Sequence, residues 1–269
     1  MSELIRTEVR GHVLTVGLDR PDKRNAVNRQ MMREISAAYS ELCDAPDLRC
    51  AVLYSTSDMF CAGLDLIDMA PLLMQQAGVD DVIVTDDQVD VFNWAGAAGR
   101  PGRRRSKPVV TAVNGKCLTA GIELALSTDI VVAEASSVFA QAEVRWGMMP
   151  LGGAIERFTQ RLGWGDAMRL LLTGDEFSAA EAHRLGLVQE VVSDGGAFDR
   201  AFEIAERIAA NAPLGVQGVI ENAYVALDDP QHASKRLRPY GQETISPSKD
   251  LQEGVAAVFQ KRAPIYKGH

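Results

Sequence analysis

Two glutamates in apolar surroundings are the residues of this chain best suited to acid–base chemistry. Glu123 follows the small residues Thr119, Ala120 and Gly121 and enters an apolar run, and Glu143 lies 20 positions later among small and apolar neighbours. Burying an ionised carboxylate in apolar surroundings costs free energy. Two glutamates in such surroundings therefore indicate a role in proton transfer. Either glutamate taken alone is also compatible with a surface position or a helix cap, so the surrounding sequence must decide.

Two Ala-Gly turns offer backbone N–H groups to a developing negative charge. Ala120-Gly121 stands where a strand is expected to turn into a helix, and Ala62-Gly63 follows another expected strand. Small residues let a ligand approach the backbone, and the first N–H groups of a helix lack intrahelical partners. Such a donor to an oxyanion contributes roughly 10²–10³ in rate. Each turn alone would also serve simple helix–strand packing.

The elements that must position these residues alternate between strands and helices. Alternating or continuous apolar runs predict strands at 4–9, 12–18, 50–55, 108–113, 129–133, 137–139 and 188–192. Helical spacing predicts helices at 28–43 with Asn28 as N-cap, at 182–187 after a capping box from Ser178, and at 198–211, and residues 115–127 are expected to form a turn followed by a helix. Residues 68–107 are the least regular and are expected to hold one or two helices, with Asp80-Asp81 and Asp86-Asp87 as caps or turns. The fold class is α/β, with domains expected at 1–195 and at 196–269, the latter helical.

Composition excludes several classes of protein. The chain has 269 residues, 46% of them hydrophobic, and a net charge of −8, which argues against a general binder of nucleic acid or anionic membrane. No secretory signal and no apolar run of about 18 residues is present. The four cysteines form no CxxC, so reduced thiols and the cytoplasm are expected. The four histidines have no metal-ligand spacing, and no P-loop or GxSxG motif is found.

Basic residues gather in two places. Lys23 and Arg24 follow Arg20-Pro21, and a second cluster runs from Arg100 through residues 103–105 to Lys107. Either cluster could meet phosphates, but exposed cations more often meet water. We expect the second cluster to be a solvated surface.

Several motifs in series carry a family resemblance. They are Arg20-Pro21 with Asn25-Ala26, residues 60–66 (FCAGLDL), Lys107-Pro108-Val109, Asn114-Gly115 with residues 121–124 (GIEL), Asp129-Ile130, residues 139–143 (FAQAE), residues 150–153 (PLGG), and residues 172–174 (LTG) with 182–188. Together they resemble the crotonase superfamily, and within it the enoyl-CoA hydratases, from about residue 4 to the C-terminus. The resemblance implies a crotonase-like ββα spiral core with a helical C-terminal oligomerisation part, in a homotrimer or homohexamer.

The resemblance also implies a role for each acid and each turn. The backbone N–H groups of Leu64 and Ala120 would hold a thioester carbonyl, although the family often has alanine at the first position and usually glycine at the second. Glu123 would deprotonate the attacking water, and Glu143 would deliver a proton to the α-carbon. Ala142 stands where the family often has proline, which affects the loop but not the carboxyl group.

Substrate contacts follow by the same resemblance. The CoA moiety would contact Lys23, Arg24, Ala26, Ala62, Asp65 and Leu66, and the C-terminal residues Phe259 and Lys261 of the same or a neighbouring subunit. The acyl pocket would include Met69, Leu72 and Leu73. No metal or redox cofactor is implied, since CoA is part of the acyl-CoA substrate.

Three functions stay open. Hydration of 2-enoyl-CoA to 3-hydroxyacyl-CoA, as in fatty acid metabolism, fits best because both acids are present. Δ3-Δ2-enoyl-CoA isomerisation, or other acyl-CoA processing in the superfamily, would use one carboxylate. A non-catalytic acyl-CoA-binding protein would be expected to have lost one or both acids.

Overall fold

A six-stranded sheet forms the centre of the computed structural model, which describes residues 3–74, 84–93, 101–229 and 233–269. Its strands run in the order β1 (Ile5–Arg10), β2 (Val13–Leu18), β3 (Cys50–Ser55), β4 (Val109–Val113), β6 (Ile130–Glu134) and β9 (Glu190–Val192). β1 pairs antiparallel with β2, and the other pairs are parallel. β2 and β4 are buried along their whole length, as expected for parallel strands covered on both faces. The predicted α/β fold is confirmed.

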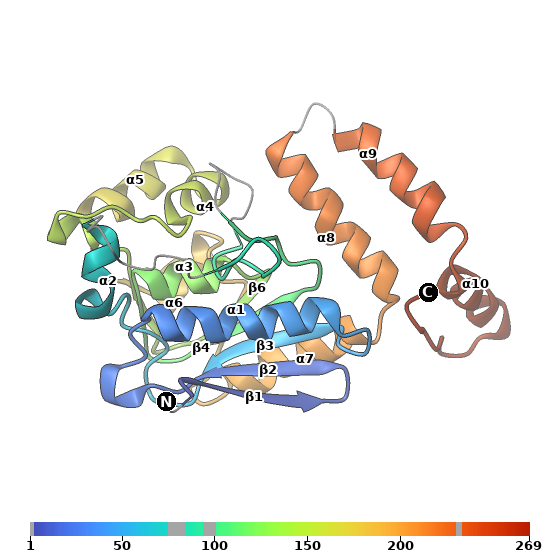
Figure 1. The fold of residues 1–269 in the computed structure, drawn as a ribbon, viewed down its shortest axis with the longest axis horizontal. Coiled ribbons are helices and arrows are strands. Elements are labelled where there is room, and N and C mark those ends of the chain that lie inside the picture. Colours follow the sequence, from blue (N-terminus) through green and yellow to red (C-terminus); the bar gives the residue numbers. More distant parts are fainter. Residues whose placement is uncertain (1–2, 75–83, 94–100, 230–232) are drawn as a thin grey trace.

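Helices α1 (Arg29–Asp44) and α7 (Ala197–Ala209) cover the two faces of this sheet (Figure 1), and side chains of the strands pack against both layers. Leu14, Val16 and Leu18 share a core with helix α1, whereas Val13, with Val52 and Val110 of the neighbouring strands, packs with helix α7. This two-sided arrangement follows from the period of two along a strand. The domain boundary after residue 195 stays a prediction, but α7 packs on the sheet.

A smaller sheet and the helices around it carry the residues of interest. β5 (Lys116–Leu118), β7 (Val138–Ala140) and β8 (Phe177–Ser178) form this sheet. The remaining helices and 3₁₀ turns of the core are α2 (Leu66–Leu73), α3 (Ala120–Leu126), the 3₁₀ turns Pro21–Lys23 and Glu143–Trp146, α4 (Ala154–Arg161), α5 (Trp164–Thr173) and α6 (Ala179–Arg184). The chain therefore passes from β5 directly into α3, where the first small-residue turn was predicted.

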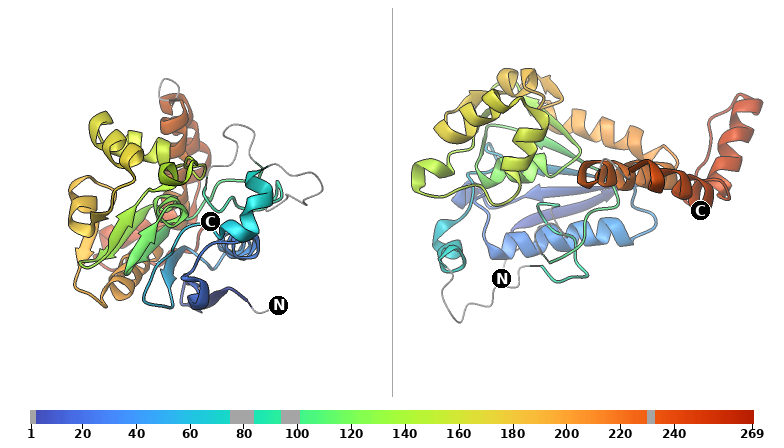
Figure 2. Two further views of the ribbon diagram at one scale, coloured as in Figure 1. Left: turned by 90° about the vertical axis from the view of Figure 1, so that its left-hand side faces the viewer. Right: turned by 90° about the horizontal axis from the view of Figure 1, so that it is seen from above.

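The C-terminal helices extend away from this core (Figures 1 and 2). They are α8 (Pro213–Asp228), α9 (Ala233–Tyr240), a π-helical turn at Gly241–Ile245, and α10 (Lys249–Gln260). The ion pair between Arg104 and Asp228 fastens the end of α8 to the core at 2.6 Å. Among the described residues, no helix is long and apolar enough to cross a membrane.

Local signals succeeded where the partner groups are close in sequence. The predicted N-cap Asn28 accepts from the Met31 N–H at 2.9 Å, so α1 begins at Arg29. Ser178 likewise accepts from the Glu181 N–H, so the predicted cap is confirmed. Because Ser178 is the N-cap, the helix begins at Ala179, earlier than the predicted residue 182. Asp80-Asp81 lie outside the described residues, and Asp86-Asp87 lie in a turn.

The prediction that residues 100–107 form a solvated basic surface is wrong for two of its members. Arg105 is 2% exposed and donates to Asp129 and to the Ser127 carbonyl, while Lys107 donates to the Ala45 carbonyl. Burying a cation costs free energy unless other groups compensate its charge, and here Asp129 pairs with Arg105 while backbone carbonyls accept from both side chains. Arg103 and Arg104 do form surface ion pairs, and Arg100 lies outside the described residues.

Candidate active site

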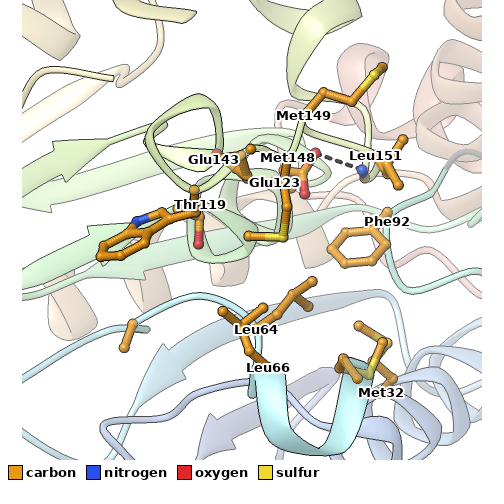
Figure 3. A pocket seen from close by; sticks show the side chains of 15 residues that line it. Met32, Leu64, Leu66, Phe92, Thr119, Glu123, Glu143, Met148, Met149 and Leu151 are labelled. Carbon is orange, nitrogen blue, oxygen red and sulfur yellow. Dashed lines mark hydrogen bonds between the residues drawn. The ribbon is translucent and has the colours of Figure 1, made fainter. Parts of the chain in front are cut away.

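The two glutamates singled out from the sequence line one cavity of about 490 Å³. Glu123 reaches it from the first turn of α3, and Glu143 reaches it from the 3₁₀ turn Glu143–Trp146. Figure 3 shows both carboxyl groups on one side of the cavity, with Leu64 and Leu66 across from them. The structure thus brings together the two acids that lie 20 positions apart in the sequence.

Backbone N–H groups hold the Glu123 carboxylate. Its Oε1 accepts from the N–H of Gly152 at 2.6 Å (Figure 3) and from the N–H of Ala154 at 3.2 Å. A Cβ atom at Gly152 would lie 2.7 Å from Glu123 Oε2 and 3.0 Å from the Phe92 ring. Only glycine therefore lets this segment approach the carboxylate closely enough to donate.

A side chain holds the Glu143 carboxylate. Its Oε1 accepts from Gln141 Nε2 at 2.8 Å, and both residues are buried. Its Oε2 is also buried and, within the described part of the chain, has no hydrogen-bond partner. Buried polar atoms are normally paired, so an unpaired carboxyl oxygen on a side chain that lines a cavity indicates an atom that binds a substrate or a proton.

Burial makes both acids harder to ionise. Desolvation, and then the negative charge of Glu143, raise the pKa of Glu123 to about 7, against the opposing effect of the Ala154 and Gly152 N–H groups and of Arg157. Desolvation also raises the pKa of Glu143, opposed by a hydrogen bond from its own backbone and by Gln141. Two acids whose pKa values are moved toward neutrality in one cavity are typical of acid–base catalysis.

The two Ala-Gly turns are in direct contact. Cys61 pairs with Cys117 in a parallel bridge. A Cβ atom at Gly63 would lie 2.0 Å from Thr119 Oγ1, and one at Gly121 would lie 2.8 Å from Cys61 Cβ. The missing side chains at the two glycines are what allow the turns to meet.

Both predicted N–H donors belong to these turns. Val27 pairs with Leu64 through the Gly63 carbonyl and the Asp65 N–H, so the Leu64 N–H points to the other side of its strand. Ala120 is the first residue of α3, whose earliest N–H groups have no intrahelical acceptor. Thr119 before it has φ of 48°, which is costly for a residue other than glycine and marks a constrained turn.

The residues predicted to contact CoA lie in two segments. Ala62 and Leu66 line the cavity, while Lys23 borders a groove that opens beside α2. Lys23, Arg24 and Ala26 share a loop that the buried Asn25 organises: its Oδ1 accepts from the Arg20 N–H, and its Nδ2 lies within hydrogen-bond distance of the carbonyls of residues 59 and 60 and of two serine hydroxyls.

Asp65 is held within the chain itself. Its side chain caps α2 and pairs with Arg20 at 2.9 Å. Arg20 also donates to the Ala26 carbonyl, so the two segments are joined. The contact with CoA predicted for Asp65 stays a prediction.

The C-terminal residues do not reach the cavity within one chain. Phe259 is 83% exposed on α10, and Lys261 ends that helix with a left-handed φ. Figures 1 and 2 place α10 at the opposite end of the molecule from α2. Within a single chain, these two residues are therefore not part of the site.

The cavity wall contains more residues than those predicted for the acyl pocket. Met69 lines the cavity, Leu72 is half-buried against the core, and the side chain of Leu73 lies outside the described part. The wall also contains apolar residues that we did not predict: Met32, Phe92, Trp146, Met148, Met149 and Leu151. The signal available for four of them was the apolar run directly after Glu143. In the described part of the chain, no three His, Cys, Asp or Glu side chains are grouped to hold a metal ion.

Comparison with known proteins gives a consistent answer. The model of the family "Enoyl-CoA hydratase/isomerase" matches residues 8–269. The chain belongs to this family. Enoyl-CoA hydratase EchA19 of Mycobacterium tuberculosis is 34% identical over 97% of this chain and 95% of its own length. A mevalonyl-coenzyme A hydratase of Beauveria bassiana is 33% identical over 95% of this chain and 91% of its own.

Solved structures agree with the family. The crystal structure of a probable enoyl-CoA hydratase/isomerase from Mycobacterium abscessus has a TM-score of 0.92 and 41% identity, and covers 99% of both chains. The predicted crotonase fold, with its spiral core and helical C-terminal part, is therefore confirmed. The family is one of enzymes, and an acyl-CoA thioester substrate is consistent with it.

Proposed function

We propose that this member of the family hydrates 2-enoyl-CoA to 3-hydroxyacyl-CoA. The observation that carries the proposal is the pair of buried glutamates on one side of an apolar cavity, each held differently. Hydration needs one group to deprotonate water and another to supply a proton to carbon. Both carboxyl groups have raised pKa values. Glu123 is held by backbone N–H groups and Glu143 has one oxygen without a hydrogen-bond partner among the described residues, so the two can supply these two functions.

Glu123 is the base in this proposal. Its carboxylate is fixed by two N–H groups, so it can orient a water molecule toward the β-carbon and accept one of its protons. The C–O bond forms as the double-bond electrons move toward the thioester oxygen. The N–H groups of Leu64 and Ala120 would stabilise that oxygen, each contributing roughly 10²–10³ in rate.

Glu143 is the acid. The coupled pair is reactive when it holds a single proton and that proton lies on Glu143. Because Gln141 donates to Oε1, the acidic proton belongs on Oε2, which has no hydrogen-bond partner among the described residues. Transfer of that proton to the α-carbon completes the addition of water. Glu123 is then protonated and Glu143 ionised, and exchange with solvent restores the starting state.

The remaining site assignments follow the same proposal. Lys23, Arg24, Ala26, Ala62, Asp65 and Leu66 would hold CoA, and Met69 with Leu72 and Leu73 would contact the acyl chain. Phe259 and Lys261 would contribute from a neighbouring subunit of a homotrimer or homohexamer, because they do not reach the cavity of their own chain. We propose a cytoplasmic enzyme that needs no cofactor beyond the CoA of its substrate.

Turnover in ¹⁸O-labelled water tests the reaction. We expect crotonyl-CoA to give 3-hydroxybutyryl-CoA with one labelled oxygen. A shift of the double bond in 3-enoyl-CoA without oxygen incorporation would instead identify an isomerase. Saturable binding of straight, branched and aromatic enoyl-CoAs with no turnover would identify a binding protein. The acyl screen is needed because the two relatives named above carry different acyl groups in their names.

A further inference from the structure

A buried arginine lies directly behind the Glu123 carboxylate. Arg157 on α4 is 7% exposed, and its guanidinium donates to the Gly152 carbonyl at 2.9 Å and to the Phe92 carbonyl at 2.6 Å. Gly152 is the same residue whose N–H binds Glu123 at 2.6 Å. One peptide segment therefore connects the carboxylate on one side to the guanidinium on the other.

The turn before α4 is shaped around this guanidinium. Gly153 caps α4 with φ of 97°, and a Cβ atom there would lie 2.3 Å from Arg157 Nη1. Glycine is needed at this position both for the backbone conformation and for the space that the arginine fills. The turn and the arginine are thus fitted to each other.

The second acceptor extends the contact to the acyl wall. Phe92 lines the cavity, and its ring lies 3.0 Å from the position that a Cβ atom at Gly152 would take. By binding the Phe92 carbonyl, Arg157 fixes this wall and the Gly152 turn relative to each other. A displacement of about 1 Å at such a support can cost about 10²-fold in rate.

We propose that Arg157 is a positioning residue, which sets the place and the charge environment of Glu123 by bridging the Gly152 and Phe92 carbonyls. The inference rests on the proposed function, in which Glu123 is the base.

The charge of Arg157 acts on Glu123 as well as its position. Glu143 and Arg157 are the charged groups that act on Glu123, and Arg157 favours its ionised form. Arg161, Arg105 and Tyr224 in turn act on Arg157, whose burial lowers its pKa only to about 10, so it stays charged at neutral pH.

Two substitutions separate position from charge. Arg157→Met removes the charge and both donors at similar length, whereas Arg157→Lys keeps the charge but cannot reach both carbonyls in the same fork geometry. We expect kcat to fall roughly 10- to 100-fold in both variants, with KM changed less than about threefold. In Arg157→Met alone, the acidic limb of the kcat/KM profile moves up by about one pH unit, because Glu123 loses a nearby cation.

Arg161→Met is the matched control. Arg161 lies on the same helix and donates to the Leu126 carbonyl, but it does not contact the Gly152 turn. This variant should lose little activity and keep the position of the limb. A folded Arg157→Met with kcat within about twofold of the wild type and an unmoved limb would overturn the proposal. If Arg157→Met does not fold, full activity in Arg157→Lys overturns it, and a lowered kcat with unchanged KM supports it.

A titration that needs no turnover separates this inference from the reaction. In protein labelled with ¹³C at glutamate carboxyl carbons, the Glu123 resonance is assigned by its absence in Glu123→Gln. Arg157→Met should move its titration midpoint upward, and Arg157→Lys should not. Failure of the wild type to hydrate any enoyl-CoA would refute the proposed function alone, whereas an unmoved Glu123 titration would refute the role of Arg157.

Discussion

Glu123 and Glu143 reach the same cavity, but different parts of the chain hold them. Two backbone N–H groups after a glycine turn fix Glu123, and a single side chain, Gln141, holds Glu143 by one oxygen. Backbone donors cannot rotate away, whereas a glutamine side chain can. The Glu123 end of the cavity is thus built for fixed position, and the Glu143 end leaves one oxygen free to carry a proton.

The largest expected effect is the loss of either carboxylate. Glu123→Gln and Glu143→Gln should each lower kcat for hydration by roughly 10²–10⁴, because each removes one proton-transfer step. Binding of a CoA ester, measured by calorimetry, should stay near the wild-type value. Near-normal turnover in either variant would contradict the assignment of Glu123 as the base and Glu143 as the acid.

Removing the space at the Glu123 end should cost less. In Gly152→Ala, the new Cβ competes with the carboxylate 2.7 Å away, so we expect kcat to fall by about 10²-fold through displacement of Glu123. Gly163→Ala is the control, since nothing lies within 4 Å of a Cβ there. Equal activity in the two variants would show that the Glu123 end tolerates movement.

Loosening the Glu143 end should cost less again. Gln141→Met keeps the volume but removes the donor to Glu143 Oε1, and kcat should fall about tenfold as the carboxyl group loses its orientation. Because Gln141 opposes the increase in the pKa of Glu143, that pKa should rise further. Steady-state kinetics across pH would show this as a basic limb moved to higher pH. A limb that moves downward would contradict the contact.

The smallest effect is one of stability, and it has the opposite sign. The pKa of Glu123 is raised to about 7, so the free energy of unfolding falls as the pH rises from about 4.5 to 7 and stays lowered above. Glu123→Gln should therefore raise the free energy of unfolding at pH 8 by roughly 1–3 kcal/mol, with little change at pH 4. Urea denaturation measures this. The exposed Glu206→Gln on α7 should show no such gain.

The two ends also differ in how far the sequence predicts them. Glu143 and Gln141 are two positions apart, and Glu123 directly follows its turn, so the local pattern contains both acids. The N–H groups that bind the Glu123 carboxylate come from residues 29 and 31 positions later in the sequence. Arg157 donates to the carbonyl of a residue 65 positions earlier. No periodicity encodes such distant pairs.

The same reason explains why the cation cluster was misjudged. A run of arginines predicts an exposed surface. Arg105 is instead buried, and it donates hydrogen bonds to Asp129, 24 positions later, and to two backbone carbonyls. By contrast, the caps at Asn28 and Ser178 depend on neighbours three residues away, and both were found. Prediction succeeded where the chemistry is local and failed where folding brings its partners together.

The contact between the two glycine turns restricts how this protein can change over evolution. A methyl group at Gly63 would collide with Thr119, and one at Gly121 would collide with Cys61. A larger residue at either glycine would therefore have to displace the facing side chain, and at Gly63 it would also be strained by the φ of 109°. In the segment 146–151, by contrast, Trp146, Met149 and Leu151 are largely exposed at the edge of the cavity. Libraries that seek new acyl specificity should therefore diversify that segment and leave both glycines intact.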